Sequence, residues 1–304
     1  MAVHQYHPQS RPHPGETLRE KLQELGMGPK EFALRTCKPE KTIIAVLNGE
    51  SSITPDMAIA FETVTMIPAS FWMNHQCAYD EYVARQKQRG TVEASVEWAK
   101  QFPLTEMIKK GWLPATKSMQ DKTLALLAFF GIASHTAWSK YYCEQQLKVA
   151  FGISINGIQQ PHALSAWLRK GEQQAYELKT SEFSASALRN ALPEMKRVML
   201  QNSSTSLERL QEISSKSGLK VIWTPMLRSS GVTGAARWCN GNPVVQIAKT
   251  GKINGDYWYR YFHQVGHILL HGKKNVFLES SQHDQVEPHM ESEADEFAER
   301  WIGS

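Results

Sequence analysis

The chain has 304 residues, which is enough for two or three domains with substantial buried cores. Its 41% hydrophobic and 21% charged residues, four scattered cysteines and lack of a long apolar run exclude a membrane protein and a disulfide framework, so a cytoplasmic protein is expected. The net charge is +4, but residues 1–90 hold ten basic and ten acidic residues, so their net charge is no argument for DNA binding.

The first 13 residues are rich in His, Pro and Gln and have no apolar period, so a flexible arm is predicted over residues 1–13. Apolar residues at helical spacing, bounded by prolines and glycines, then predict five short helices. They cover about residues 17–25, 29–36, 39–47, 54–64 and 68–85. Five short helices with a tight turn between the second and third predict a helix-turn-helix domain over residues 14–89.

Three stretches of this segment are distinctive in their amino-acid sequence as well as in their apolar spacing. They read Pro29-Lys-Glu-Phe-Ala, Leu47-Asn-Gly-Glu-Ser-Ser-Ile-Thr-Pro-Asp-Met-Ala and Phe71-Trp-Met-Asn. In these stretches the chain resembles the HigA-type antitoxins of the XRE family. The resemblance implies operator DNA as a partner, a homodimer on paired half-sites, and a toxin protein as a possible further partner.

On this resemblance, the helix that begins at Pro39 is the recognition helix. The side chains expected to face base edges are Glu40, Lys41 and Thr42. Phosphate contacts are expected from Lys30, Lys38 and Asn48. The residues by themselves leave an alternative open, which is that these polar side chains only form a solvated helix face.

A mostly helical middle region is predicted over residues 90–215, after a charged stretch at 86–90 that is expected to be a linker or a frayed helix end. Its helices are predicted at about 92–101, 104–110, 121–130, 134–149, 161–179, 184–200 and 205–217. Many aromatic residues lie in these helices. We interpret them as core packing and not as a ligand cage.

From Gly218 the apolar period changes from helical to extended, and strands are predicted over residues 219–223, 231–238 and 243–248. Asn240-Gly-Asn is a hairpin signal between the last two. Strands ahead of a histidine-bearing helix favour a small zincin-like α+β domain over residues 216–304, with an antiparallel sheet above a metal. The fold class is therefore mainly α with this small domain. Because the chain ends within a predicted helix, the domain is expected to be truncated.

The histidine-bearing stretch reads Tyr261-Phe-His-Gln-Val-Gly-His-Ile-Leu-Leu-His. His263 and His267 are four residues apart, so both imidazoles lie on one face of a helix and can share a metal ion, as in a zincin. A third ligand is needed from another segment. Glu291 and Asp295 lie on one face of a later helix, so Glu291 can reach the metal while Asp295 accepts a histidine N–H. Glu293 points away from that face and stays an alternative third ligand.

The joint pattern His-x-x-Gly-His-x-Leu-Leu-His with Glu-x-Glu-Ala-Asp-x-Phe-Ala is similar to the ImmA/IrrE metallopeptidases. This resemblance implies a Zn²⁺ cofactor and cleavage of a protein substrate under stress, which would be a repressor, an antitoxin or the chain itself. In that family a glutamate after the first histidine is the general base, whereas this chain has Gln264. An amide cannot take the proton, so the chain is expected to be inactive or nearly inactive as a peptidase.

Two explanations of Gln264 stay open. If the glutamine is natural, the domain is a pseudo-peptidase that senses a ligand or binds a toxin, and the chain is an antitoxin-like repressor. If the glutamine replaces a glutamate, it inactivates a peptidase and leaves the metal ligands in place. The intact motif on both sides of Gln264 favours the second explanation. The sequence thus predicts a DNA-binding transcriptional regulator with a zinc metallopeptidase domain.

Overall fold

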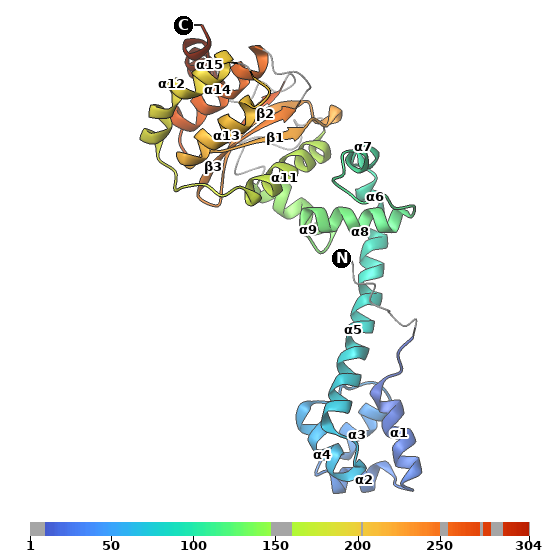
Figure 1. The fold of residues 1–304 in the computed structure, drawn as a ribbon. Coiled ribbons are helices and arrows are strands. Elements are labelled where there is room, and N and C mark those ends of the chain that lie inside the picture. Colours follow the sequence, from blue (N-terminus) through green and yellow to red (C-terminus); the bar gives the residue numbers. More distant parts are fainter. Residues whose placement is uncertain are drawn as a thin grey trace. The chain divides into compact units, whose positions relative to one another are not determined.

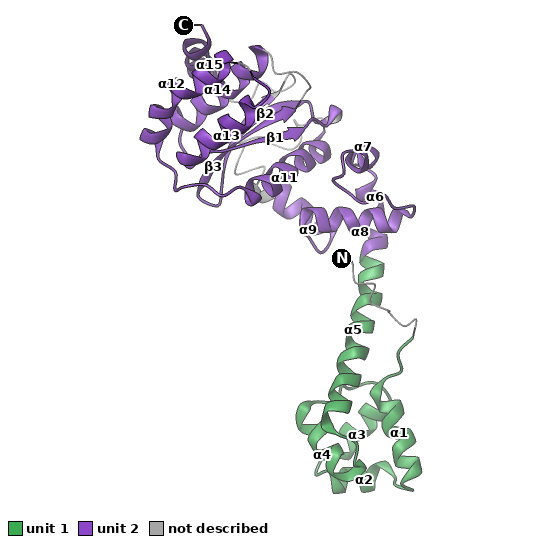
Figure 2. Cartoon of the chain, viewed as in Figure 1, with its two compact units in different colours: residues 1–91 green, residues 92–304 purple. Residues whose placement is uncertain are grey.

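The computed structural model describes residues 10–146, 160–201, 203–249, 255–273, 276–280 and 288–303. The chain divides into two compact units, residues 1–91 and 92–304, which Figure 2 shows in separate colours. Residues 1–9 of the predicted arm, the end of the predicted helix 134–149 and His283 lie outside the described residues. No helix of the described part of the chain is long and apolar enough to cross a membrane.

The first unit contains the five predicted helices (Figure 1). They are α1 (Pro14–Glu24), α2 (Pro29–Arg35), α3 (Glu40–Leu47), α4 (Pro55–Thr65) and α5 (Ala69–Ala94). A proline begins α1, α2 and α4, where its missing N–H leaves no hydrogen bond unmade. One residue of each helix is fully buried in a common core: Leu18, Phe32, Ile43, Phe61 and Trp72. These contacts confirm the predicted helix-turn-helix core.

The predicted linker at residues 86–90 is wrong, because α5 continues through it as far as Ala94. Gln, Lys and Arg are strong helix formers, and a single glycine costs only about 1 kcal/mol in a helix interior. The boundary between the two units therefore falls within the last turns of a helix.

The second unit begins with short helices. They are α6 (Val96–Ala99), α7 (Leu104–Lys109), α8 (Met119–Phe130), α9 (His135–Trp138) and the π-helical segment η1 (Ser139–Gln146). Three further helices follow: α11 (Pro161–Glu177), α12 (Ala185–Gln201) and α13 (Ser206–Lys216). Trp98, Phe102, Phe130, Trp138 and Trp167 are buried in one cluster. The aromatic residues therefore form core, as predicted.

The sheet is mixed and has four described strands in the order β1-β3-β2-β4. The strands are β1 (Lys220–Pro225), β2 (Val232–Cys239), β3 (Asn242–Lys249) and β4 (Phe277–Ser280), and a short 3-10 helix, η3 (Arg228–Ser230), precedes β2. The prediction of a wholly antiparallel sheet was wrong, because β1 runs parallel to β3. The predicted hairpin is present: Asn240 and Gly241 both have positive φ, as a two-residue turn requires.

Helices cover both faces of this sheet. Val221 and Val245 pack with α12, α13 and α14 (Gly255–Leu270), whereas Ile222 and Val244 pack with Ala175 of α11. The last helix, α15 (Pro288–Ile302), packs against α14 (Figure 1). Their close approach depends on Gly266 of α14, because a methyl group there would lie 3.2 Å from the Phe297 ring. This helix pair carries the candidate site.

Candidate functional site

The two predicted histidines lie side by side on the buried face of α14. His263 is 4% exposed and His267 is fully buried. Their Nε2 atoms are 3.0 Å apart, as residues one helical turn apart on the same face should be. The helix forms because Tyr257, Trp258 and Tyr261 repeat at helical spacing and are buried in the core.

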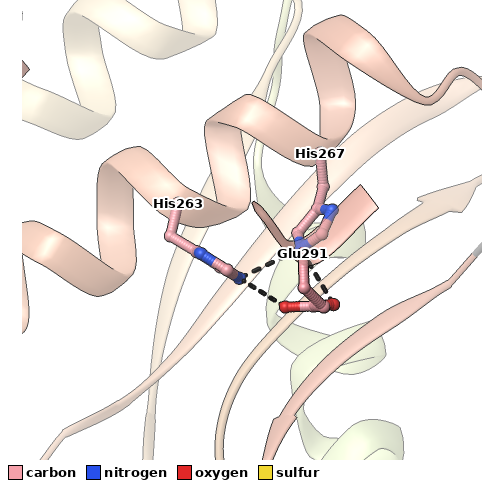
Figure 3. A group of neighbouring side chains, drawn as sticks. All are labelled: His263, His267 and Glu291. Carbon is pink, nitrogen blue, oxygen red and sulfur yellow. Dashed lines mark hydrogen bonds and ion pairs between the residues drawn. The ribbon is translucent and has the colours of Figure 1, made fainter. Parts of the chain in front are cut away.

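Glu291 of α15 completes the group. Its Oε2 atom is 3.2 Å from His263 Nε2, and its Oε1 atom is 3.4 Å from His267 Nε2. Figure 3 shows the carboxylate facing both rings, with dashed lines that join the three side chains. The ligand atoms of these three residues all lie within 4.8 Å of one another, a spacing that can hold a metal ion. Two imidazoles and one carboxylate are a donor set found in catalytic zinc sites.

Asp295 supports His263 from behind. Its Oδ1 atom lies 2.9 Å from His263 Nδ1 and also accepts a 2.6 Å hydrogen bond from the Tyr259 hydroxyl. An ionised carboxylate only accepts, so Nδ1 of His263 carries a proton, and release of any proton on Nε2 leaves a lone pair there. That lone pair faces the other two members of the group, as a metal ligand must.

Glu293, the alternative third ligand, lies elsewhere. Its Oε2 atom is 2.9 Å from His271 Nε2, on the outer side of the histidine group. His271 Nδ1 is in turn 3.0 Å from His267 Nδ1. His289 lies exposed in the first turn of α15. Neither Glu293 nor His289 belongs to the convergent group.

The environment of the group sets its charges. Burial lowers the pKa of His267 to about 4, although the Glu291 carboxylate beside it acts in the opposite direction. Burial also disfavours charge on His263, but the Glu291 carboxylate outweighs this and raises the pKa of His263. Burial disfavours the charged form of Glu291, yet the two histidines beside it lower the pKa of its carboxyl to about 2. At neutral pH, Glu291 is ionised and His267 is neutral, as metal ligands are, whereas a metal ion would have to displace any proton that His263 holds on Nε2.

Gln264 is fully buried beside the histidines, and neither its amide nitrogen nor its amide oxygen has a hydrogen-bond partner within the described part of the chain. The sequence reasoning missed its neighbour Glu279 of β4. A methyl group at Gly234 would lie 2.8 Å from Glu279 Oε2 and 3.3 Å from Gln264 Nε2, so both groups border one small space. Arg260 Nε donates a 2.9 Å hydrogen bond to Glu279 Oε1, while Oε2 is buried without a described partner. Burial raises the pKa of Glu279.

The six residues predicted to contact DNA all lie on the first unit. Glu40, Lys41 and Asn48 are exposed on α3 or at its end, and Thr42 is half-buried. Lys30 is exposed on α2. Lys38, between the two helices, forms an ion pair with Asp56 of α4, which the sequence gave no reason to expect. Ile44 of α3 is 42% exposed between the polar residues.

Comparison with known proteins supports this domain. An uncharacterised helix-turn-helix transcriptional regulator of Escherichia coli K12, YddM, is 33% identical over 70 residues, which cover 23% of this chain and 74% of that protein. The chain belongs to the helix-turn-helix transcriptional regulators. No family model matches the chain.

Two solved structures are each similar to about a quarter of this chain. An addiction-module antidote protein of a HigA family from Coxiella burnetii is 37% identical. The match covers 28% of this chain and 95% of that chain and has a TM-score of 0.26. The Pseudomonas aeruginosa antitoxin HigA, solved with the higBA promoter, is 34% identical. The match covers 26% of this chain and 90% of that chain and has a TM-score of 0.25.

Proposed function

We propose that this regulator binds operator DNA through its HigA-like domain and holds zinc in a metallopeptidase-type domain over residues 216–304. The domain limits that we propose are 14–89 for DNA binding and 90–215 for the helical middle region. One observation carries the proposal: three buried or half-buried ligands, His263, His267 and Glu291, converge on one point.

The DNA-binding part of the proposal rests on family membership and on α3. A 34% identical antitoxin was solved with its promoter. The exposed side chains at the start of α3 include Glu40 and Lys41, and helix starts are where regulators of this architecture read bases. We assign Glu40, Lys41 and Thr42 to base contacts, and Lys30 and Asn48 to phosphates. Lys38 keeps a phosphate role only if DNA competes with Asp56 for its amine. A homodimer would place two such helices on paired half-sites.

The metal part of the proposal rests on the donor set. Three protein ligands leave a fourth position open, which is the pattern of a catalytic zinc site and not of a closed structural site. When bound, zinc would polarise a peptide carbonyl and make water a stronger nucleophile. The chain itself supplies two imidazoles, one carboxylate and the supporting carboxylate of Asp295.

Gln264 decides what the site does chemically. Its position, directly after the first histidine on the buried face of α14, is that of a general base in a zincin. A glutamine amide cannot accept the proton of an attacking water, so the unaltered chain would bind metal and hydrolyse little or nothing. With glutamate at this position, the domain would be a metalloendopeptidase acting on a protein, either a regulator, an antitoxin or the chain itself.

The second candidate function follows from the same side chain. An uncharged, fully buried Gln264 suits a domain that has given up hydrolysis and keeps its metal to sense a ligand or bind a toxin. In that case, the chain would be an antitoxin-like repressor with a pseudo-peptidase domain.

Changing Gln264→Glu separates the two candidate functions. The zinc-loaded variant should cleave itself or a cellular protein, with new termini identified by mass spectrometry, and the same variant with His263→Ala should not. If the variant binds zinc and operator DNA but cuts nothing, the peptidase function is refuted and the sensor remains. If it binds no zinc, both versions of the metal proposal fail.

A further inference from the structure

His271 continues the line of histidines along α14. Its backbone N–H donates to the carbonyl of His267, so the helical hydrogen-bond pattern continues one residue past Leu270. Its side chain is only 4% exposed. His271 Nδ1 is 3.0 Å from His267 Nδ1, and its Nε2 is 2.9 Å from Glu293 Oε2. Its ring therefore links the outer nitrogen of His267 to a carboxylate of α15.

The donors and acceptors in this chain of contacts determine which ring nitrogens of His271 and His267 carry protons. The Glu293 carboxylate only accepts, so His271 Nε2 carries a proton and donates it. A neutral His271 then has a lone pair on Nδ1, which accepts from the N–H at His267 Nδ1. The remaining nitrogen, His267 Nε2, is left with a lone pair directed at Glu291 and His263. This is the tautomer that a metal ligand requires.

The ring plane of His267 is fixed as well. Phe277 of β4 stacks on it at a centroid distance of 3.8 Å and an angle of 10° between the planes. Phe277 also lies 5.3 Å from the His271 ring. The stacking fixes the ring plane but allows both orientations that a 180° flip about the Cβ–Cγ bond relates, and the hydrogen bond to His271 selects one of them.

The two metal-binding histidines are thus supported alike, each by a carboxylate of α15. Asp295 reaches His263 directly, whereas Glu293 reaches His267 through His271. We propose that His271 and Glu293 are positioning residues that fix the tautomer and the orientation of His267, and that neither binds the metal. This inference rests on the proposed metal site.

The pattern of contacts argues against His271 as a ligand. Its Nδ1 faces the outer nitrogen of His267, away from the convergent group, and its Nε2 is occupied by Glu293. In the described part of the chain, the cluster with ligand spacing contains His263, His267 and Glu291 without His271.

The test compares two replacements of His271 in the full-length chain. In His271→Gln, the amide oxygen can accept from His267 and the amide nitrogen can donate to Glu293, whereas His271→Leu removes both functions. We expect the zinc Kd, measured by competition with a chromophoric chelator, to rise about 10- to 100-fold in His271→Leu. In His271→Gln it should stay within about threefold. Glu293→Gln should fall between them, and Glu296→Gln, an exposed change on α15, should have no effect.

Two further readouts separate a positioning role from a structural one. The cobalt(II) absorption spectrum should change in shape in His271→Leu and be restored in His271→Gln, with circular dichroism of both variants unchanged. In the zinc-free chain, ¹⁵N NMR should find the His267 proton on Nδ1 and should find it displaced in His271→Leu. The proposal is overturned if a folded His271→Leu binds zinc within twofold of the unaltered chain, or if His267 carries its proton on Nε2. If the unaltered chain binds no zinc, the metal site fails, and the NMR measurement alone decides the tautomer.

Discussion

The two ends of this chain are built on different physical principles. The first unit is held by apolar side chains from five helices, and the polar residues proposed to contact DNA lie exposed or half-buried on it. The candidate metal centre is built from polar side chains in the interior, each held by a hydrogen bond to another. Apolar cores tolerate changes that preserve volume, whereas a buried polar network depends on every member. The two units should therefore fail in different ways when they are altered.

The largest expected effect is in the apolar unit. Trp72 is fully buried and its ring packs against Phe61 and Phe71. Trp72→Ala should lower the free energy of unfolding of the first unit by about 3–5 kcal/mol. Denaturation followed by circular dichroism should show an unfolding transition at lower denaturant concentration. Operator binding should be lost, and the zinc affinity should be unchanged. A parallel loss of zinc binding would mean that the two units do not fold separately.

A change in the polar network around the candidate metal site should weaken zinc binding and leave the fold intact. Asp295→Asn keeps the size of the side chain, but its amide can present an N–H to His263 Nδ1 in place of a carboxylate oxygen. We expect the zinc Kd to rise about 10- to 100-fold, with the melting temperature of the zinc-free chain changed little. Tyr259→Phe, which removes only the donor to Asp295, should have a smaller effect. Equal effects from the two variants would show that packing, and not the carboxylate, supports His263.

The surface of the first unit should separate base contacts from phosphate contacts. Lys41→Ala at the start of α3 should weaken operator binding about tenfold and relax the sequence preference. Lys30→Ala on α2 should weaken binding to all sequences alike and reduce the salt slope by about 1. Electrophoretic mobility shifts over a salt series measure both. If Lys41→Ala leaves the preference unchanged, α3 is not the recognition helix.

The smallest expected effect concerns the ion pair of Lys38 and Asp56. The carboxylate is 81% exposed, so Asp56→Asn should change the free energy of unfolding by less than about 1 kcal/mol. The same change frees the Lys38 amine, and operator affinity should rise slightly if Lys38 contacts phosphate. Unchanged affinity would remove Lys38 from the DNA interface.

Sequence reasoning reached the parts of the molecule that depend on local spacing. His263 and His267 share a helical face, and Glu291 and Asp295 share another, so both pairs followed from the period of a helix. The hairpin at Asn240 and Gly241 followed from turn chemistry.

What sequence reasoning missed depends on segments that meet only in the folded chain. β1 pairs in parallel with β3 although β2 lies between them in the sequence. β4 has four residues, too few for an alternating pattern. Glu279 and the contact of His271 with Glu293 therefore had no local signal. The extension of α5 was missed because a glycine was given more weight than the helix formers around it.

The metal content of the purified full-length chain tests the central claim most directly. Elemental analysis after dialysis against zinc should find one ion per chain, and a variant with both His263→Ala and His267→Ala should retain none while its operator binding is unchanged. A folded, DNA-binding chain that holds no metal, or one that holds the same amount in the double variant, would contradict the account.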